Sequence, residues 1–383
     1  MKRLECLDGL RGVLAVYVMV SHMAPFIAAP DWAVHPFSHG MAAVDVFFIL
    51  SGMVILGSFD GFGHRMAPFL AARVFRIFPV FLVVFAAAIV IQPLAVGYDK
   101  MPWIGTDSPA RLLWSEGWPA DWAGNIAAHL TMTHGIFPDG AWPHVYLGFL
   151  GASWSLSTEW QFYLLAALCV RPGREWKLVA GFLGLAALAL LWDQRAPEAW
   201  LFSRAFLPNK AHYFALGMAS ILLFRSGGWR DVGRSRFIAV LGTVLVLCWM
   251  QGGAGKLAAP LVWTLCLAAQ QRQTGMLGPL AAMLRWRPML WLGSISYCVY
   301  LVNEPVQKLL GRILAFLAGG HSTVFTMLWV PSALLLPVLI AWWLHRAIEQ
   351  PALRLGKPYI RRMGDARDPA LNLPSPRIIS SRV

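Results

Sequence analysis

The stretch LDGLRGVLAVYVMVSHM, residues 7–23, combines an apolar run suited to a membrane span with three ionisable side chains. Asp8 and Arg11 stand near its beginning, and His22 follows Arg11 by eleven residues. Because an α-helix turns about 100° per residue, Arg11 and His22 lie on one face, roughly 16 Å apart along the axis. Asp8 is one turn before Arg11, where opposite charges can pair. The pattern predicts a charged cluster at one end of a span and an imidazole far across the membrane from it.

The composition of the whole chain indicates that its solvent is a lipid bilayer. Of 383 residues, 58% are hydrophobic and only 13% are charged, whereas soluble domains have about 25% charged residues. The 19 Trp agree with this, because Trp is enriched at membrane–water interfaces. The five Cys are scattered and odd in number, which argues against a disulfide framework, and no metal site is expected.

Ten apolar segments predict an all-α integral membrane protein with about ten transmembrane helices, which places both termini on one side. Most of the 32 Lys and Arg fall in the connections and the tail on that side, so the positive-inside rule makes both termini cytoplasmic. The net charge of +13 is thus mainly a signal of orientation, and no nucleic-acid partner is expected. The predicted segments are 8–29, 41–59, 77–96, 144–170, 178–192, 205–224, 237–251, 257–270, 289–303 and 323–345.

The chain is expected to form one membrane domain at 1–355, followed by a disordered basic cytoplasmic tail at 356–383. The longest external connection, about 97–143, is too long for a simple connector. It either covers a site from outside or is a plain surface loop. No internal repeat is visible, which weakens the case for a transporter built from inverted repeats.

Polar side chains in other spans mark further candidate site residues, because charge inside a membrane is costly and usually functional. The second span, AAVDVFFILSGMVI, carries Asp45 and Ser51. Arg73 and Arg76, one turn apart at the third span, either hold a phosphorylated ligand or anchor the cytoplasmic end. Glu159, in SWSLSTEWQFYLL, needs a partner or a proton, and a histidine elsewhere in the bundle is the expected partner.

Together, these segments resemble the acyltransferase-3 family of integral membrane O-acyltransferases. The family's blocks are matched in order by LDGLRG with Arg11 and His22, by Asp45–Gly52, by Arg73, Arg76 and Pro79, by Trp154–Leu164, by Ser296–Leu301 and by Glu349–Pro351. One block would be a weak signal, but six in order across nearly the whole chain are specific. The chain is similar to the stand-alone members, which carry no added hydrolase-like domain.

One position departs from the family pattern. The family commonly has His where this chain has Asn303, so proton transfer by a second histidine is not expected here. An asparagine side chain can still donate and accept hydrogen bonds. Asn303 is therefore expected to be structural or to orient a substrate.

The resemblance implies a membrane enzyme that transfers an acyl group, most often acetyl from acetyl-CoA, to a hydroxyl of a cell-envelope or secreted carbohydrate or glycolipid. It implies a multi-pass protein of the bacterial inner membrane, with polysaccharide-assembly machinery as a candidate partner and no permanently bound cofactor. His22 is then the predicted catalytic base, or a transient acyl carrier, and both routes stay open. Glu159 is expected to hold its imidazole, as the acid of a triad does. Arg11, Arg73 and Arg76 are expected to bind CoA phosphates, and Asp8, Asp45, Ser51, Tyr297 and Asn303 to orient substrate.

Two other functions remain alternatives. The intramembrane Asp, Arg, His and Glu could form the proton relay of a transporter for a small or lipid-linked substrate. A non-catalytic scaffold of a polysaccharide-assembly complex would follow if Asn303 abolished activity. Within the enzyme hypothesis, the residues do not choose among an exopolysaccharide or O-antigen repeat, a lipid-linked oligosaccharide, a lipo-oligosaccharide and a macrolide sugar.

Overall fold

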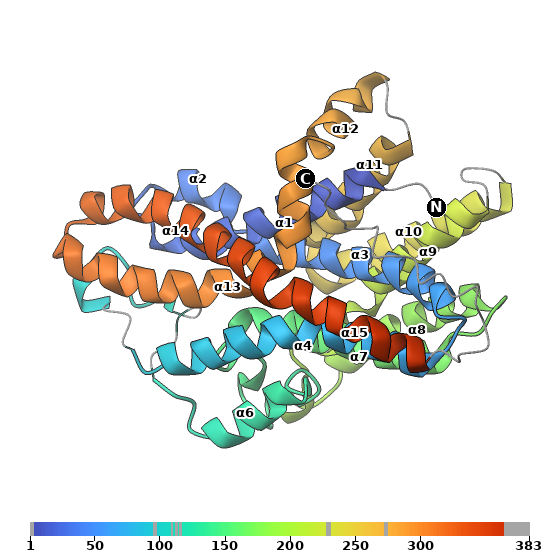
Figure 1. Ribbon diagram of the computed structural model, residues 1–383, viewed down its shortest axis with the longest axis horizontal. Coiled ribbons are helices and arrows are strands. Elements are labelled where there is room, and N and C mark those ends of the chain that lie inside the picture. The colour runs from blue at the N-terminus through green and yellow to red at the C-terminus, as the bar shows by residue number, and fades with distance from the viewer. Residues whose placement is uncertain are drawn as a thin grey trace.

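The computed structural model describes residues 4–94, 98–108, 110–111, 114, 117–226, 231–271 and 275–363, which form a bundle of helices (Figure 1). Apart from an isolated β-bridge between Pro138 and Phe202, this part of the chain contains no β structure. The predicted all-α class is confirmed.

Each of the ten predicted apolar segments overlaps one helix of the structure. These helices are α1 (Glu5–Met23), α3 (Gly40–Gly61), α4 (Met66–Ile91), α7 (Trp154–Cys169), α8 (Glu175–Asp193), α9 (Ala211–Arg225), α10 (Asp231–Gly252), α11 (Ala258–Gln271), α13 (Arg287–Ala318) and α14 (Ser322–Leu344). The other α-helices named below are α6 (Trp122–Leu130) and α15 (Gln350–Met363).

Within the described residues, six helical stretches are long and apolar enough to cross a membrane. They are Glu5–Phe26, Asp31–Gly61, Met66–Ile91, Glu175–Asp193, Val232–Gln271 and Ser322–Met363. Several candidate membrane-spanning helices are therefore present, while the count of ten spans stays a prediction.

Several helix boundaries differ from the sequence-based expectation, and the largest difference is that α13 ends at Ala318 rather than at residue 303. α4 begins at Met66 rather than at residue 77, so Arg73 and Arg76 lie inside the helix and not at its entry. α7 begins at Trp154 rather than at residue 144, because glycine-rich turns and two short 3-10 helices precede it. α15 continues to Met363, so residues 356–363 of the expected disordered tail are helical, and residues 364–383 lie outside the described part.

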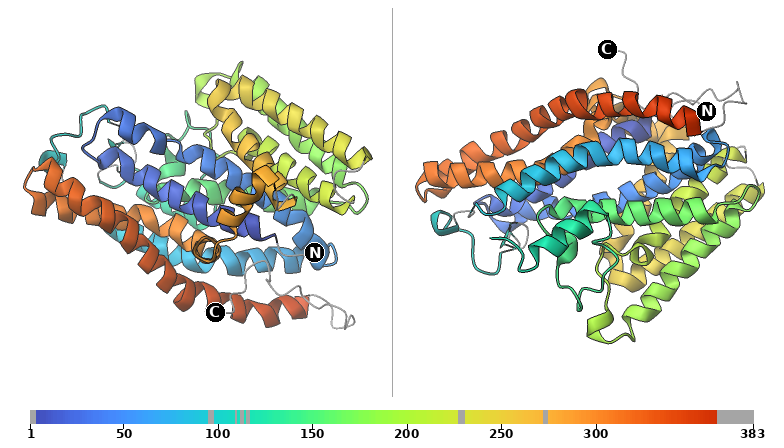
Figure 2. Two further views of the ribbon diagram at one scale, coloured as in Figure 1. Left: turned by 90° about the horizontal axis from the view of Figure 1, so that it is seen from above. Right: turned by 60° about the horizontal axis from the view of Figure 1, so that its bottom comes forward.

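α1 lies at the centre of the bundle, beside α13, α3 and α11 (Figure 2). Two glycines of α1 and α13 let the helices approach closely. A Cβ on Gly12 would collide with the carbonyl of Met289 in α13, and one on Gly293 would collide with the carbonyl of Asp8 in α1. Small residues at such contacts are typical of helix packing in membranes. Gly12 of LDGLRG and Gly293 therefore set the distance between α1 and α13.

The two ends of α1 define two ends of the bundle, here called the Arg11 end and the His22 end. α14 starts at the His22 end, where the N–H of Ala28 donates to Thr326 Oγ1 (3.2 Å). The residues after α14 lie at the Arg11 end, because Glu349 contacts Arg76, which is within electrostatic range of Arg11. The first residues of α1 and the last residues of α14 thus both lie at the Arg11 end of the bundle. The cytoplasmic location of the Arg11 end stays a prediction.

The expected external connection packs against the His22 end. Trp114 stacks on Phe26, with ring centroids 3.5 Å apart, and Trp103 Nε1 donates to the carbonyl of Phe26 (3.2 Å). From α14, Trp329 Nε1 donates to the carbonyl of Met23, directly after His22 (3.1 Å). Part of 97–143 lies outside the described residues. The described part favours a covering role over that of a plain surface loop.

Candidate active site

His22 and Asn303 form a hydrogen-bonded pair between α1 and α13. Their Nδ1 and Oδ1 atoms are 2.7 Å apart. Asn303 Nδ2 donates to the carbonyls of Val299 (3.0 Å) and Tyr300 (2.7 Å), so its Oδ1 is the acceptor for His22. The Nδ1 of His22 is therefore the donor, and its Nε2 carries an unshared electron pair. The arrangement fixes the imidazole tautomer that can act as a base or nucleophile.

The helix turn around Asn303 also holds the start of α7. Glu304 accepts hydrogen bonds from the backbone N–H of Gly151 (3.0 Å) and Ala152 (2.8 Å). Tyr300 OH shares a hydrogen bond with Ser155 Oγ (2.8 Å). Glu304 was missed from the sequence, although an acid inside an apolar segment is the signal that singled out Glu159.

Glu159 lies in a different cluster and does not hold His22, which corrects the expected pairing. Its Oε1 accepts hydrogen bonds from Ser51 Oγ (2.6 Å) and from Tyr163 OH. It is within electrostatic range of both Arg11 and Arg73. Among the described residues no hydrogen bond joins Glu159 to His22; Asn303 takes the orienting role instead. Glu159 thus balances arginine charge at the Arg11 end.

Arg73 is buried and incompletely hydrogen-bonded. Its guanidinium carbon lies 5.2 Å from the ring centroids of both Phe69 and Tyr163, within cation–π range. Its Nε is buried and has no hydrogen-bond acceptor. A buried charged donor without a partner is costly. Such a donor favours an anionic ligand at this end of the bundle.

Arg76 is paired with the π-helical turn His345–Glu349, which joins α14 to α15. Its Nη1 lies 3.7 Å from Glu349 Oε1, and His345 Nδ1 lies 2.7 Å from Glu349 Oε2. Cys298 Sγ donates to the same carboxylate (3.3 Å). In the described part of the chain, Cys298, His345 and Glu349 place metal-ligand atoms within 4.8 Å of one another. The positive charge of Arg76 already balances the negative charge of Glu349, so charge balance in this cluster requires no metal ion.

Of the five residues predicted to orient substrate, Asn303 alone contacts His22 among the residues described. Asp45 instead forms a buried ion pair with Lys210 (2.7 Å). Tyr297 OH donates to the carbonyl of Ile77 (2.6 Å), Ser51 donates to Glu159, and Asp8 is within electrostatic range of Arg11.

A family model described as an acyltransferase domain, that of acyltransferase family 3, matches residues 4–346. This chain belongs to the acyltransferase-3 family. It is 26% identical to "Acyltransferase MdmB" of Streptomyces mycarofaciens over 397 aligned residues, which cover 96% of each chain. No solved structure matches it.

In this acyltransferase-3 protein, candidate catalytic and anion-binding side chains lie at the two ends of α1. The His22 end has an imidazole of fixed tautomer, and His22 is only partly buried. The Arg11 end has three arginines, of which Arg73 keeps a buried N–H unpaired. The arrangement can supply a base at one end and an anion site at the other.

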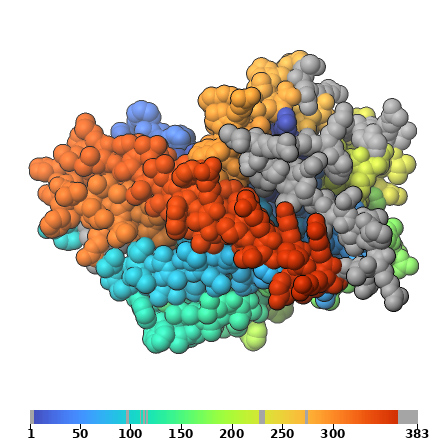
Figure 3. Space-filling view, viewed as in Figure 1, coloured from blue at the N-terminus to red at the C-terminus, as the bar shows by residue number. Residues whose placement is uncertain are grey.

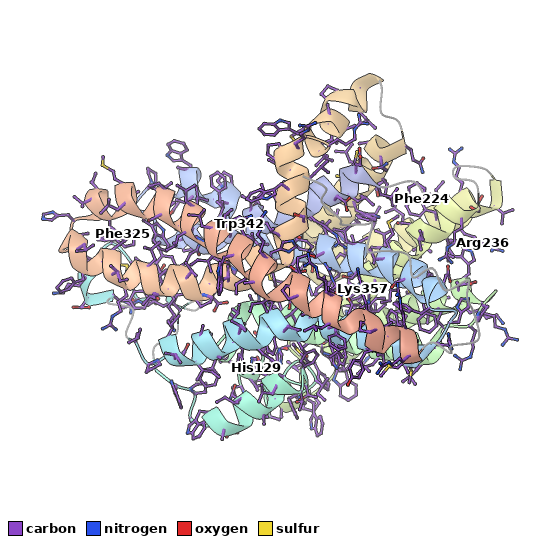
Figure 4. The ribbon with its side chains drawn as sticks, viewed as in Figure 1. His129, Phe224, Arg236, Phe325, Trp342 and Lys357 are labelled. Carbon is purple, nitrogen blue, oxygen red and sulfur yellow. The ribbon has the colours of Figure 1, made fainter. Side chains whose placement is uncertain are left out.

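Two further histidines near the His22 end are structural. His129 lies on α6 (Figure 4). Its ring stacks on that of His134, with ring centroids 4.0 Å apart, and also on Phe85 of α4. His129 Nδ1 is hydrogen-bonded to the carbonyl of Asn125, and His134 Nε2 is hydrogen-bonded to the carbonyl of Ser153 (3.1 Å). Burial lowers the pKa of His134 to about 4 and that of His129 well below its usual value. Burial therefore favours the neutral form of both rings.

Proposed function

We propose that this protein is a membrane O-acyltransferase that moves an acyl group, acetyl first among the candidates, from acyl-CoA to a hydroxyl of a cell-envelope or secreted carbohydrate. The observation that carries the proposal is the hydrogen bond from His22 Nδ1 to Asn303, which leaves Nε2 as a base. The family membership and the relative named an acyltransferase support acyl transfer.

In the proposed reaction, His22 Nε2 takes the proton of the acceptor hydroxyl as its oxygen attacks the thioester carbonyl. The ester C–O bond forms, the C–S bond breaks, and the thiolate of CoA receives the proton from the imidazolium. Asn303 Oδ1 holds the Nδ1–H throughout and accepts a stronger hydrogen bond from the charged ring. In the alternative route, Nε2 attacks the thioester first, the C–S bond breaks and CoA leaves as a thiolate. The acceptor hydroxyl then attacks the acyl-imidazole, the ester C–O bond forms as the C–N bond breaks, and the hydroxyl proton passes to the CoA thiolate.

The arginines of the Arg11 end are proposed to bind the phosphates of the donor. Guanidinium groups suit phosphate because they offer forked N–H donors and keep their charge. Arg73 has a buried Nε without an acceptor, and Glu159 offsets the arginine charge while no donor is bound. The roughly 16 Å between Arg11 and His22 then separates the phosphates from the reacting thioester.

The proposal is tested with the full-length protein in nanodiscs and acetyl-CoA labelled in the acetyl group. Release of free CoA together with a labelled ester on a supplied glycan supports it. A protein that moves protons or a glycan across liposomes without consuming any common acyl-CoA would instead be a transporter. Absence of both activities would favour the scaffold.

Arg73→Gln is expected to raise the KM for acetyl-CoA by about 10- to 100-fold, because a hydrogen bond to a charged group contributes about 1.5–3 kcal/mol. S-acetylpantetheine, which has no phosphate, serves as the matched donor. Wild type and variant should use this short donor equally well. An equal loss with both donors would show that Arg73 supports the structure and does not bind phosphate.

Asn303→Ala is expected to lower kcat by about 10²-fold or more, because a misoriented or wrongly protonated imidazole loses most of a general base's 10²–10⁴-fold contribution. Asn303→Asp keeps an acceptor at Nδ1 and should retain more activity than Asn303→Ala. Asn303→His restores the residue common in the family. If activity appeared only in Asn303→His, the wild-type protein would be a scaffold.

A further inference from the structure

α15 has three distinct faces that the proposed reaction does not use. Gly356 and Ile360 are buried against the bundle. Leu355, Tyr359 and Met363, spaced by four residues, form an apolar stripe with exposures of 69%, 61% and 48%. The remaining face carries exposed basic side chains at Arg354, Lys357 and Arg361, and the exposed Arg362 borders the apolar stripe. An apolar stripe beside a basic one on a single helix is typical of segments that lie in a membrane interface.

Because α14 is a candidate membrane span, α15 is expected to begin at the edge of the membrane. The helix follows α14, an uncharged segment of 23 residues, and lies on the molecular surface beside the first half of α4 (Figure 3). A Cβ on Gly356 would meet the ring of Phe75, and the Tyr359 and Phe75 ring centroids are 6.2 Å apart. Lys357 is on the exposed side of α15 (Figure 4).

The charge of α15 has no protein partner among the described residues. No hydrogen bond or ion pair involves Arg354, Lys357 or Arg361, and the described part of α15 contains no acidic residue. Anionic lipid headgroups would complement the charge of the basic face of α15. The apolar stripe would contact the acyl chains. Each Lys or Arg near an anionic leaflet strengthens association by about fivefold.

We propose that α15 is a docking helix for anionic phospholipids of the leaflet at the Arg11 end. The occupant is the headgroup and upper acyl region of that leaflet. Lipid held there also steadies the candidate donor site, because Phe75 precedes Arg76 and Glu349 directly precedes α15. The docking does not depend on the proposed function; the effect on the donor does.

Lipid preference is measured on full-length protein in phosphatidylcholine nanodiscs with and without phosphatidylglycerol. Spin-labelled forms of both lipids report which is retained at the protein surface. The wild type should prefer phosphatidylglycerol, and R354Q/K357Q/R361Q should reduce that preference by at least about tenfold. The control R174Q/K177Q/R234Q removes three exposed charges that are predicted to lie on the same side of the membrane, and it should keep the preference. An equal loss in both variants, or none in either, would overturn the proposal.

A second measurement determines whether the apolar stripe or the basic face of α15 is turned toward the lipid. Cys169 is the exposed free cysteine of the described chain, so Cys169→Ser provides a background for nitroxide labels at Leu355→Cys and Arg361→Cys. The label at 355 should be more accessible to oxygen, and the one at 361 to a water-soluble nickel reagent. A label at 355 that is as accessible to nickel as the one at 361 would contradict docking.

The effect on the donor site is read separately from docking. R354Q/K357Q/R361Q is expected to raise the KM for acetyl-CoA in phosphatidylglycerol discs to its value in phosphatidylcholine discs, with the control unchanged. Loss of lipid preference without any change in KM would leave docking standing and remove the link to Arg76. Absence of turnover in the wild type would count against the proposed function, while both lipid measurements would still decide docking.

Discussion

His22→Ala is expected to lower kcat for acetyl transfer by about 10³-fold, because a positioned general base contributes 10²–10⁴-fold. Asn303 holds the ring by its Nδ1, so the variant removes a base of fixed tautomer. The measurement is release of CoA and ester formation by protein of unchanged size-exclusion profile. Because the loss concerns the chemical step, the KM for acetyl-CoA should change little.

His39→Ala provides the matched control, since His39 is an exposed imidazole directly before α3 and is not bonded to His22. It should retain wild-type turnover. Acid quenching during turnover distinguishes the two routes. A labelled acyl group on wild-type protein that disappears in His22→Ala would indicate the acyl-imidazole route. Equal turnover by wild type and His22→Ala would remove His22 from the mechanism.

Lys210→Met is expected to destabilise the protein by about 3–5 kcal/mol, because it leaves a buried carboxylate without its partner. Lys210 Nζ lies 2.7 Å from Asp45 Oδ1, and the two side chains are 6% and 2% exposed. The midpoint of unfolding in mixed micelles of increasing SDS reports the loss. Lys256→Met, which removes a nearby cation outside the pair, should have a much smaller effect.

The double variant Asp45→Leu/Lys210→Met distinguishes a structural role of Asp45 from a substrate role. Replacing both members of a buried ion pair by apolar residues is often neutral or stabilising. We therefore expect the double variant to recover most of the stability that Lys210→Met loses. Recovery of both stability and activity would make Asp45 structural. A stable but inactive double variant would support its predicted part in substrate orientation.

The candidate site was partly predictable from residue types. An imidazole and an arginine inside an apolar segment stand out because charge in a membrane is costly, so His22 and Arg11 were found without a structure. The partners were harder to predict, since they come from distant parts of the chain. Residue types predict Glu159 as the partner of His22, but hydrogen bonds from Ser51 and Tyr163 hold its carboxylate in another cluster. Asn303, identified as a departure from the family, proved to be the residue that orients the imidazole.

The helical class and the positions of the ten apolar helices were determined by the sequence alone, because a backbone in lipid must satisfy its own hydrogen bonds. The exact starts of α4 and α7 were not, since Arg73 and Arg76 lie within one helix instead of marking its entry, and glycine-rich turns shorten the other. The tertiary structure alone decided which polar side chains meet. Hydrophobic periodicity reports that a helix is buried, but the pairing of His22 with Asn303 and of Asp45 with Lys210 depends on which helices pack together, and a contact between residues 281 positions apart leaves no local signal.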